Sequence, residues 1–191
     1  MEALIRACAC VLEARGFAGT TTNHIAERAG VNIASLYQYF PGKDALVALV
    51  ADRLVRRILD DLSVGLPAIL ETPETAMRAW VARMQEALER ERTLINVFRE
   101  EVPYVDQLPA VRGLRKRLVE FSDEARRASP FVHADFNAAT LHLAINLTVT
   151  TLLELDSLPD ELPRATVLDE LAVRLEGWVR GPRSSEALLD A

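Results

Sequence analysis

Apolar residues recur along this chain every three or four positions, which is the spacing of one face of an α-helix. Residues 2–15 place their apolar side chains on one such face: Leu4, Ile5, Cys8, Val11 and Leu12. Gly16 follows, and glycine readily takes the left-handed backbone conformation that ends many helices. The pattern predicts a helix over 2–15 that ends at Gly16.

Two short helices are predicted next, with a glycine turn between them. The first covers residues 23–29, and Thr22 is its expected N-cap because a hydroxyl oxygen can accept from an orphan backbone N–H. Gly30 makes the turn. Asn32 is the expected cap of the second helix, over 33–39, which the Phe-Pro-Gly sequence after it ends.

The remainder of the chain is also predicted to be helical. The periodicity continues over residues 43–62, 73–91, 93–102, 110–128, 135–155 and 166–180. We expect the Gly-Leu-Pro sequence at 65–67 to end the first of these helices, because proline lacks a backbone N–H donor and its ring collides with the preceding turn. Alternation with a period of two, the pattern of β-strands, is scarce. The prediction is an all-α protein.

Composition and cysteine usage agree with a globular helical protein in the cytoplasm. Half of the 191 residues are hydrophobic, which is ample for a packed core. The longest apolar stretch, residues 138–153, is interrupted by His142 and Asn146 and is expected to be a buried helix and no membrane span. Cys8 and Cys10 point to different faces of a helix and cannot pair with each other. No secretory pattern opens the chain.

The net charge of −6 is unevenly distributed. Residues 1–46 hold four Lys or Arg and four Asp or Glu, so the acidic excess lies in residues 47–191. This balance argues against a generally basic nucleic-acid coat, and it is consistent with a small DNA-contacting module on a larger domain with another role. The charge distribution alone thus divides the chain into a neutral part over residues 1–46 and an acidic part over residues 47–191.

Residues 20–46 read TTTNHIAERAGVNIASLYQYFPGKDAL. A short helix, a glycine turn and a second short helix form the geometry that places the second helix in the DNA major groove. Tyr37 and Tyr39 end in hydroxyls that can reach phosphate oxygens, Lys43 adds a positive charge, and Thr22 offers a further hydroxyl. Hydroxyls and amides can hold phosphates, so this surface needs little net charge.

This stretch resembles the DNA-binding signature of TetR-family transcriptional regulators. In that family a threonine pair opens the second helix, followed by Ile-Ala, Ala-Gly-Val, Leu-Tyr-x-Tyr-Phe, Lys and Leu. The matching positions here are Thr21-Thr22, Ile25-Ala26, Ala29-Gly30-Val31, Leu36-Tyr37-Gln38-Tyr39-Phe40, Lys43 and Leu46. The resemblance covers residues 4–46, and beyond them the chain is similar only in length and helical character.

The resemblance implies two kinds of DNA contact. The base-reading candidates are Asn23, Ile33, Ala34, Ser35 and Gln38, and the phosphate-binding candidates are Thr22, Tyr37, Tyr39 and Lys43. Ile33 and Ala34 are apolar where the family often has polar residues, so we expect this helix to contact thymine methyl groups. Structural alternatives remain for single residues. Tyr39 could be half-buried in the core, Thr22 could act only as a cap, and His24 could be a solvated helix residue.

The resemblance also implies a three-helix DNA-binding domain over residues 1–46 and a helical effector-binding and dimerisation domain over residues 47–191. The protein would then be a homodimer that binds a small-molecule effector. The last two helices would form a four-helix interface through Leu143, Leu147, Leu168, Leu171 and Leu175. The effector-pocket candidates are the large or polar side chains of the larger domain: Trp80, Met84, Phe98, Tyr104, Phe121, His142 and Asn146. His142, Asn146 and Thr150 form a polar stripe that either bonds an effector or lies at the dimer interface.

We therefore predict a ligand-responsive repressor that binds a palindromic double-stranded DNA operator as a dimer. The alternative is a helix-turn-helix protein that a protein partner controls or that has no small-molecule effector. No nucleophile–base pair, metal-ligand spacing or phosphate-binding loop is visible in the sequence, and the three histidines fall in three different elements. We expect neither an enzyme nor a bound metal or cofactor.

Overall fold

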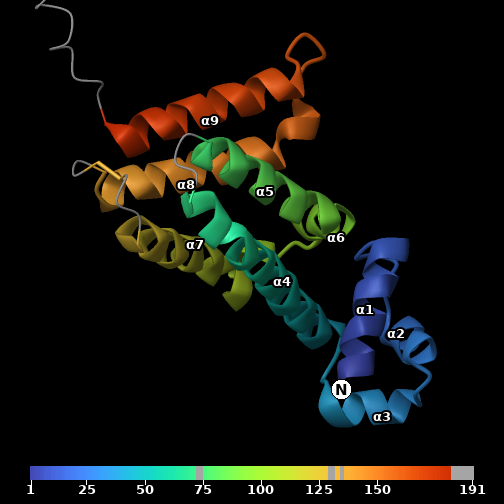
Figure 1. Cartoon of the computed structure of the whole chain (residues 1–191). Helices are drawn as coiled ribbons and strands as arrows, with labels where there is room; N and C mark the ends of the chain where they lie inside the picture. The colour runs from blue at the N-terminus through green and yellow to red at the C-terminus, as the bar shows by residue number, and fades with distance from the viewer. Residues whose placement is uncertain (72–74, 129–131, 134–135, 182–191) are drawn as a thin grey trace, which may run out of the picture. The chain divides into compact units, whose positions relative to one another are not determined.

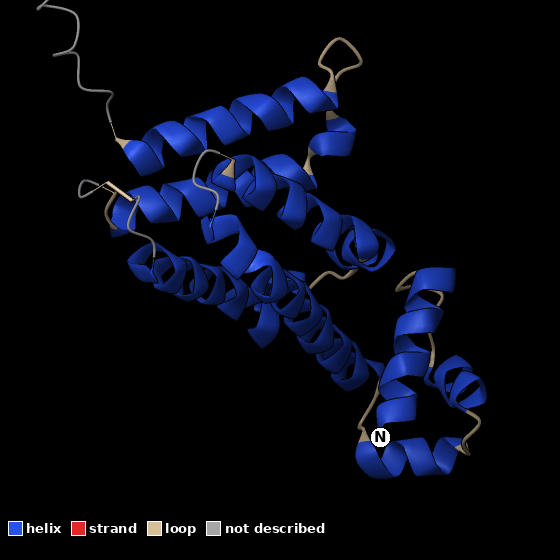
Figure 2. Ribbon diagram, in the orientation of Figure 1, coloured by secondary structure: helices blue, strands red, loops and turns tan. Residues whose placement is uncertain are grey.

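The computed structural model describes residues 1–71, 75–128, 132–133 and 136–181, apart from the side chains of 65–71 and of a few positions in the helix that begins at residue 109. These residues form helices joined by turns and loops, with no β-strand among them (Figure 2). The predicted all-α fold is therefore confirmed. Within the same residues, no helix has both the length and the apolar character that crossing a membrane requires.

Nine α-helices follow one another along the described residues (Figure 1). They are α1 (Glu2–Arg15), α2 (Thr22–Ala29), α3 (Ile33–Tyr39), α4 (Lys43–Glu71), α5 (Ala76–Arg90), α6 (Arg92–Asn96), α7 (Pro109–Ala128), α8 (Ala138–Leu153) and α9 (Arg164–Arg180). Short turns of helix lie between some of them: the π-helical η1 (Val97–Glu101) and the 3-10 helices η2 (Val105–Gln107) and η3 (Leu155–Ser157). The predicted helices agree closely with these bounds, apart from α4.

Helix α4 continues through Gly65 and Pro67 to Glu71, so the prediction that this sequence ends the helix was wrong. A proline inside a helix costs about 3 kcal/mol, because one backbone hydrogen bond is lost and the ring crowds the turn before it. The preceding turns of α4 bury Ile58 and Leu62 almost completely. Packing of this kind stabilises a helix more than intrinsic propensity does, and it offsets part of that cost in the turns before Gly65.

The chain divides into two compact units. Unit 1 consists of Met1–Asp60 and Leu88–Leu114, and unit 2 consists of residues 61–87 and 115–191. Unit 1 thus extends beyond the 46 residues expected for the DNA-binding domain. A domain of that size would bury too little apolar surface to be stable alone. Leu46, Val47 and Val50 of α4 supply core side chains that are almost completely buried.

Helix α1 packs on α2 and α6 in unit 1, and α2 packs on α3. The predicted inward face of α1 is buried at all five positions, which confirms it. Three further helices of this unit contribute completely buried leucine or isoleucine side chains: Ile25, Leu36 and Leu46. Helices α1, α2 and α3 and the start of α4 therefore all contribute buried side chains to unit 1.

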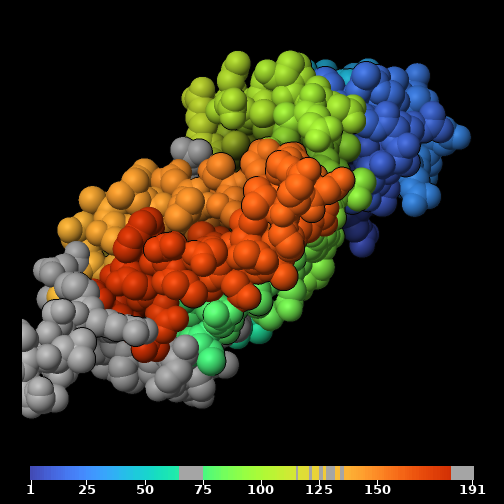
Figure 3. Space-filling view, turned by 90° about the horizontal axis from the view of Figure 1, so that it is seen from above, coloured from blue at the N-terminus to red at the C-terminus, as the bar shows by residue number. Residues whose placement is uncertain are grey.

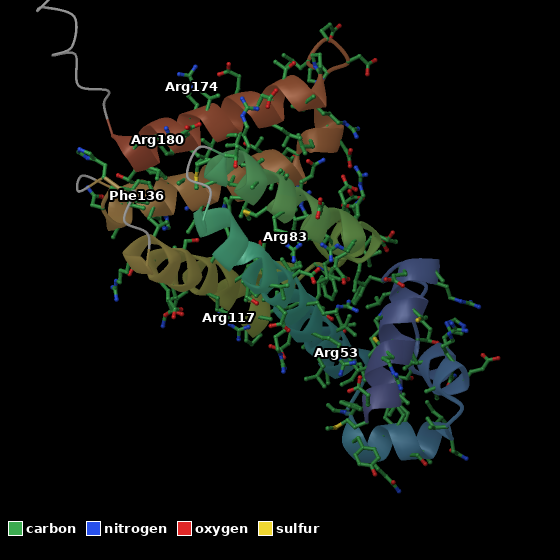
Figure 4. All side chains as sticks on the ribbon, viewed as in Figure 1. Arg53, Arg83, Arg117, Phe136, Arg174 and Arg180 are labelled. Atoms are coloured by element: carbon green, nitrogen blue, oxygen red, sulfur yellow. The ribbon has the colours of Figure 1, made fainter. Side chains whose placement is uncertain are left out.

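Helices α8 and α9 pack on each other in unit 2 and lie side by side at the surface (Figure 3). Leu171 and Leu175 of α9 are buried within the chain, whereas Leu143 and Leu147 of α8 are exposed. The five leucines expected at one dimer interface thus do not share a face. Elsewhere in this unit, Arg83 of α5 donates from Nε and Nη2 to the backbone oxygen of Asp61 in α4, at 2.9 and 2.6 Å (Figure 4).

Candidate nucleic-acid interface

The N-terminus of α2 is capped by the residue before the predicted one. Thr21 Oγ1 accepts a hydrogen bond from the backbone N–H of His24 at 3.2 Å, and Thr22 is the first residue of the helix. The prediction of Thr22 as the cap was therefore wrong, because the helix begins one residue earlier than expected. The Thr22 hydroxyl instead lies 3.0 Å from Tyr37 Oη, and this hydrogen bond joins α2 to α3.

The turn between α2 and α3 has the predicted geometry. Gly30 takes the left-handed conformation with φ 69° and ψ 30°, and the N–H of Val31 donates to the oxygen of Ala26 at 3.0 Å. Asn32 caps α3, since its Oδ1 accepts from the N–H of Ala34 at 2.8 Å. Both helix ends at this turn therefore have partners for backbone groups that a helix leaves unpaired.

Helix α3 has one buried face and one solvent-facing face. Leu36 is completely buried and Phe40, directly after the helix, is 5% exposed. Tyr37 and Tyr39 are 54% and 62% exposed, so the alternative that Tyr39 is half-buried in the core does not hold. Burial of Leu36 and Phe40 fixes the rotation of the helix about its own axis. The other side of the helix is then available to a partner.

All nine predicted DNA-contacting residues lie on α2, α3 and the first residue of α4. Five are exposed, namely Asn23, Ala34, Tyr37, Gln38 and Tyr39, and four are half-buried, namely Thr22, Ile33, Ser35 and Lys43. The exposed set includes the side chains that must reach a base edge or a phosphate from the middle of α3. None of the nine is buried, so each has some exposure to solvent, and their roles toward DNA stay a prediction.

Lys43 has partners inside the protein. Its Nζ donates to the backbone oxygens of Phe17 and Thr20 at 2.8 and 3.1 Å, and it lies 3.9 Å from the centre of the Phe17 ring. An ammonium has three N–H donors, so these two bonds leave one for a phosphate. Lys43 therefore fixes the loop between α1 and α2 in addition to any contact it makes with DNA.

Arg15 is a cation that the sequence did not single out. It is exposed at the C-terminus of α1, and its Nη1 lies 3.4 Å from Nε2 of His24. Nδ1 of the same imidazole lies 3.0 Å from the backbone oxygen of Gly19. A neutral imidazole protonated at Nδ1 satisfies both contacts, because it donates to Gly19 and accepts from Arg15. Only the folded chain brings these residues together, so helical periodicity gave no signal for them.

The effector-pocket candidates are divided between the two units. Phe98 and Tyr104 belong to unit 1, whereas Trp80, Met84, His142 and Asn146 belong to unit 2, and the side chain of Phe121 lies outside the described residues. Tyr104 Oη donates to the Asp44 carboxylate at 2.6 Å. Burial, together with Asp44, raises the pKa of this phenol well above its usual range. Tyr104 thus has a structural role beside α4.

The polar stripe of α8 lies at the surface. His142 and Thr150 are exposed, and Asn146 Nδ2 donates to the backbone oxygen of His142 at 2.8 Å. The expectation that His142 lines an internal pocket is not met, because solvent surrounds its side chain in this chain. The exposure of the stripe is consistent with the other alternative, a polar seam at an interface between two copies.

A short helix with a buried anchor, a glycine turn and an exposed polar helix face define a helix-turn-helix protein. The sequence profile described as "Bacterial regulatory proteins, tetR family" matches residues 4–50. This match agrees with the resemblance to the TetR family that the sequence showed over residues 4–46.

A curated relative is the HTH-type transcriptional repressor KstR2 of Rhodococcus jostii (strain RHA1), which is 28% identical over 105 residues. This match covers 53% of the chain and about half, 50%, of the length of that relative.

Solved structures with the same fold extend the likeness to the whole chain. The fatty acid degradation regulator FadR from Bacillus halodurans superposes with a TM-score of 0.67 at 16% identity, covering 95% of this chain and 96% of its own. A TetR transcriptional regulator from Rhodococcus sp. RHA1 gives a TM-score of 0.57 at 19% identity and covers 93% of both chains. The two-part helical fold is therefore that of TetR-type regulators. These relatives are described as transcriptional repressors or regulators.

Proposed function

We propose that this chain is a transcriptional repressor that binds a palindromic DNA operator as a homodimer and responds to a small apolar effector. The observation that carries the proposal is the outer face of α3. Tyr37 and Gln38 are exposed there while Leu36 holds the opposite face in the core. Side chains of these types can hold phosphates and read base edges in the major groove.

The hydroxyl pair of Thr22 and Tyr37 supports this orientation of α2 and α3 toward DNA. Their oxygens lie 3.0 Å apart, so one hydroxyl donates to the other and the acceptor retains its own proton for a further partner. A phosphate oxygen can accept a hydrogen bond from that hydroxyl. The pair therefore offers a preformed donor at the junction of the two helices, and preformed donors lose little conformational entropy on binding.

The homodimer is supported by exposed apolar side chains on two adjacent helices. Leu143 and Leu147 of α8 are 60% and 40% exposed, and Val173 and Trp178 of α9 are 46% and 38% exposed. Two helices from each of two copies would cover these side chains as a four-helix bundle. A two-fold axis between the copies would place their α3 helices on successive major grooves of one duplex, which requires a palindromic site.

An apolar effector is supported by the interior of unit 2. Its buried side chains among the described residues are apolar apart from Thr148, whose hydroxyl donates to the oxygen of Ala144 at 2.7 Å. A ligand entering such an interior would find few polar partners. The Bacillus halodurans neighbour is described as a regulator of fatty acid degradation. Fatty acids of several chain lengths are therefore the first effectors to test, by thermal shift and by release of bound duplex.

The DNA-binding part of the proposal is tested by selecting duplexes from a random pool with the full chain. We expect a palindromic consensus. Gln38→Ala should remove the base preference at one position of each half-site. The binding free energy that separates the preferred base from the others there should fall by about 1–3 kcal/mol. Gln107→Ala, which removes an exposed amide from η2, is the matched control and should retain the parent consensus. Absence of any enriched duplex would contradict the proposal, as would an unchanged consensus for Gln38→Ala.

A further inference from the structure

The loop Gly16–Thr21 sets where α2 begins and is tightly bonded within itself. The N–H of Gly16 donates to the oxygen of Leu12 at 2.8 Å, and Thr20 Oγ1 donates to the oxygen of Gly16 at 2.6 Å. Thr20 is only 1% exposed. The loop leads directly to the Thr21 cap and to the hydroxyl of Thr22, so any shift of the loop moves the end of α2 that faces α3.

Two oppositely charged side chains hold this loop at Phe17. Glu101 Oε2 accepts from the N–H of Phe17 at 2.7 Å, while Lys43 Nζ donates to the oxygen of the same residue at 2.8 Å. Hydrogen bonds with one charged partner are stronger than neutral ones. The ring of Phe17 adds a contact with the Lys43 ammonium and an edge-to-face contact with Tyr104, whose ring centre is 5.8 Å away.

Glu101 reaches the loop from a part of the chain outside the helix-turn-helix. It is the last residue of the π-helical turn η1, and π-helical turns occur frequently at functional sites. Its approach requires the glycine at position 16, since a Cβ built there would lie 2.3 Å from Glu101 Oε2. Gly16 also has φ 66°, a conformation that favours glycine. The glycine at position 16 thus leaves the space that the Glu101 carboxylate occupies.

We propose that Glu101 is a positioning residue of the DNA-binding surface. It fixes Phe17, and through the short loop it fixes the N-terminus of α2 where Thr22 meets Tyr37. This inference rests on the proposed DNA-binding function. Loss of the carboxylate's hydrogen bond lets the loop move and weakens the contacts that depend on geometry. Attraction of the duplex to the cations of the surface should be similar in two variants of equal charge, because it depends on charge and not on this hydrogen bond.

The test compares Glu101→Ala with Glu101→Gln in the full chain. Both changes remove the same negative charge, but the glutamine oxygen can still accept from Phe17. We expect Glu101→Ala to bind the selected duplex about fivefold more weakly than Glu101→Gln, the factor of one ordinary hydrogen bond. Both variants should bind a scrambled duplex equally. Amide hydrogen exchange at Phe17 should be faster in Glu101→Ala than in Glu101→Gln, which reports the loop directly.

Glu100 supplies the matched control, since it is exposed and adjacent in η1. Its Ala and Gln variants should bind the selected duplex equally. If Glu101→Ala does not fold, Glu101→Asp serves instead, because it keeps the charge but shortens the side chain by one methylene and should bind more weakly than the parent. Equal affinities across the Glu101 series, with a parent that prefers the selected duplex, overturn this inference alone. A parent without that preference overturns the proposed function as well.

Discussion

The two units of this protein each bury one polar side chain among the described residues, and they bond it in different ways. Thr20 of unit 1 donates to a loop oxygen, whereas Thr148 of unit 2 donates to the preceding turn of its own helix. The polar bonds of unit 1 thus fix irregular backbone beside an exposed polar surface. Unit 2 uses its polar group within a regular helix and exposes apolar side chains on α8 and α9. The contrast agrees with the proposed function, in which unit 1 binds DNA and a second copy covers the exposed apolar side chains of unit 2.

The largest expected effect comes from the apolar surface of unit 2. The double variant Leu143→Glu/Leu147→Glu places charges on the exposed face of α8 and should dissociate the proposed dimer. Each copy would then hold one half-site, and affinity for the full duplex should fall by roughly 10²–10⁴, the gain that linked binding sites usually provide. Sedimentation velocity and duplex titration measure the two effects.

Leu162→Glu is the control for this double variant. Leu162 is 50% exposed but precedes α9 and lies on neither helix of the proposed interface. It should leave both the oligomeric state and the affinity unchanged. A dimer that survives the double variant would show that other residues form the interface.

The next largest effect is a loss of stability when the irregular backbone of unit 1 is altered at Gly16. Gly16→Ala should destabilise the protein by ~1–3 kcal/mol, because alanine disfavours this backbone conformation and its Cβ would displace the Glu101 carboxylate. Urea unfolding measures the change. Gly113→Ala is the matched control: Gly113 is helical, a Cβ there would meet no atom within 4 Å, and stability should rise by about 0.5–1 kcal/mol. Equal effects of the two variants would contradict the account of the loop.

A smaller effect is expected from the hydroxyl pair. Tyr37→Phe removes the bond to Thr22 and one donor for phosphate, and it should weaken duplex binding about fivefold, as loss of one hydrogen bond would. Tyr104→Phe, also in unit 1, removes the bond to Asp44 and should change the free energy of unfolding more than it changes affinity. Fluorescence anisotropy with a labelled duplex compares the two variants. Unchanged binding by Tyr37→Phe would remove the hydroxyl pair from the interface.

The smallest expected effect is a difference in chemical labelling between the two faces of α1, measured on the unaltered protein. Cys8 is completely buried, and burial raises the pKa of its thiol to about 12, whereas Cys10 is exposed. The thiolate is the reactive form. A maleimide should therefore label Cys10 quickly and Cys8 only when the protein unfolds, which peptide mass spectrometry resolves. Equal labelling in the folded state would show that α1 does not pack as described.

Sequence patterns were sufficient for the parts of the site that depend on local spacing. The turn at Gly30 and the Asn32 cap of α3 follow from turn chemistry and helical periodicity, and both were predicted. The cap of α2 was predicted at Thr22, one residue after the true cap Thr21, because several threonines in a row offer alternative caps. Pro67 was predicted to end α4, since propensity does not include the packing of Leu62.

Contacts between distant segments had no such signal. Glu101 and Phe17 are 84 positions apart, and nothing in the periodicity of either segment joins them. The same holds for Arg15 and His24 and for the division of the pocket candidates between the units. The apolar faces of α8 and α9 were recognised as apolar, but which leucines turn inward depends on how the two helices pack.

The central claim is that the exposed face of α3 enters DNA while its buried face stays anchored in the core. Hydroxyl-radical footprinting of the full chain, with and without the selected duplex, tests it most directly. Tyr37 and Tyr39 should be oxidised readily alone and strongly protected by the duplex, while Tyr104 and Leu162 should be oxidised equally in both states. Oxidation of Tyr37 and Tyr39 that stays the same when the duplex is bound would contradict the claim.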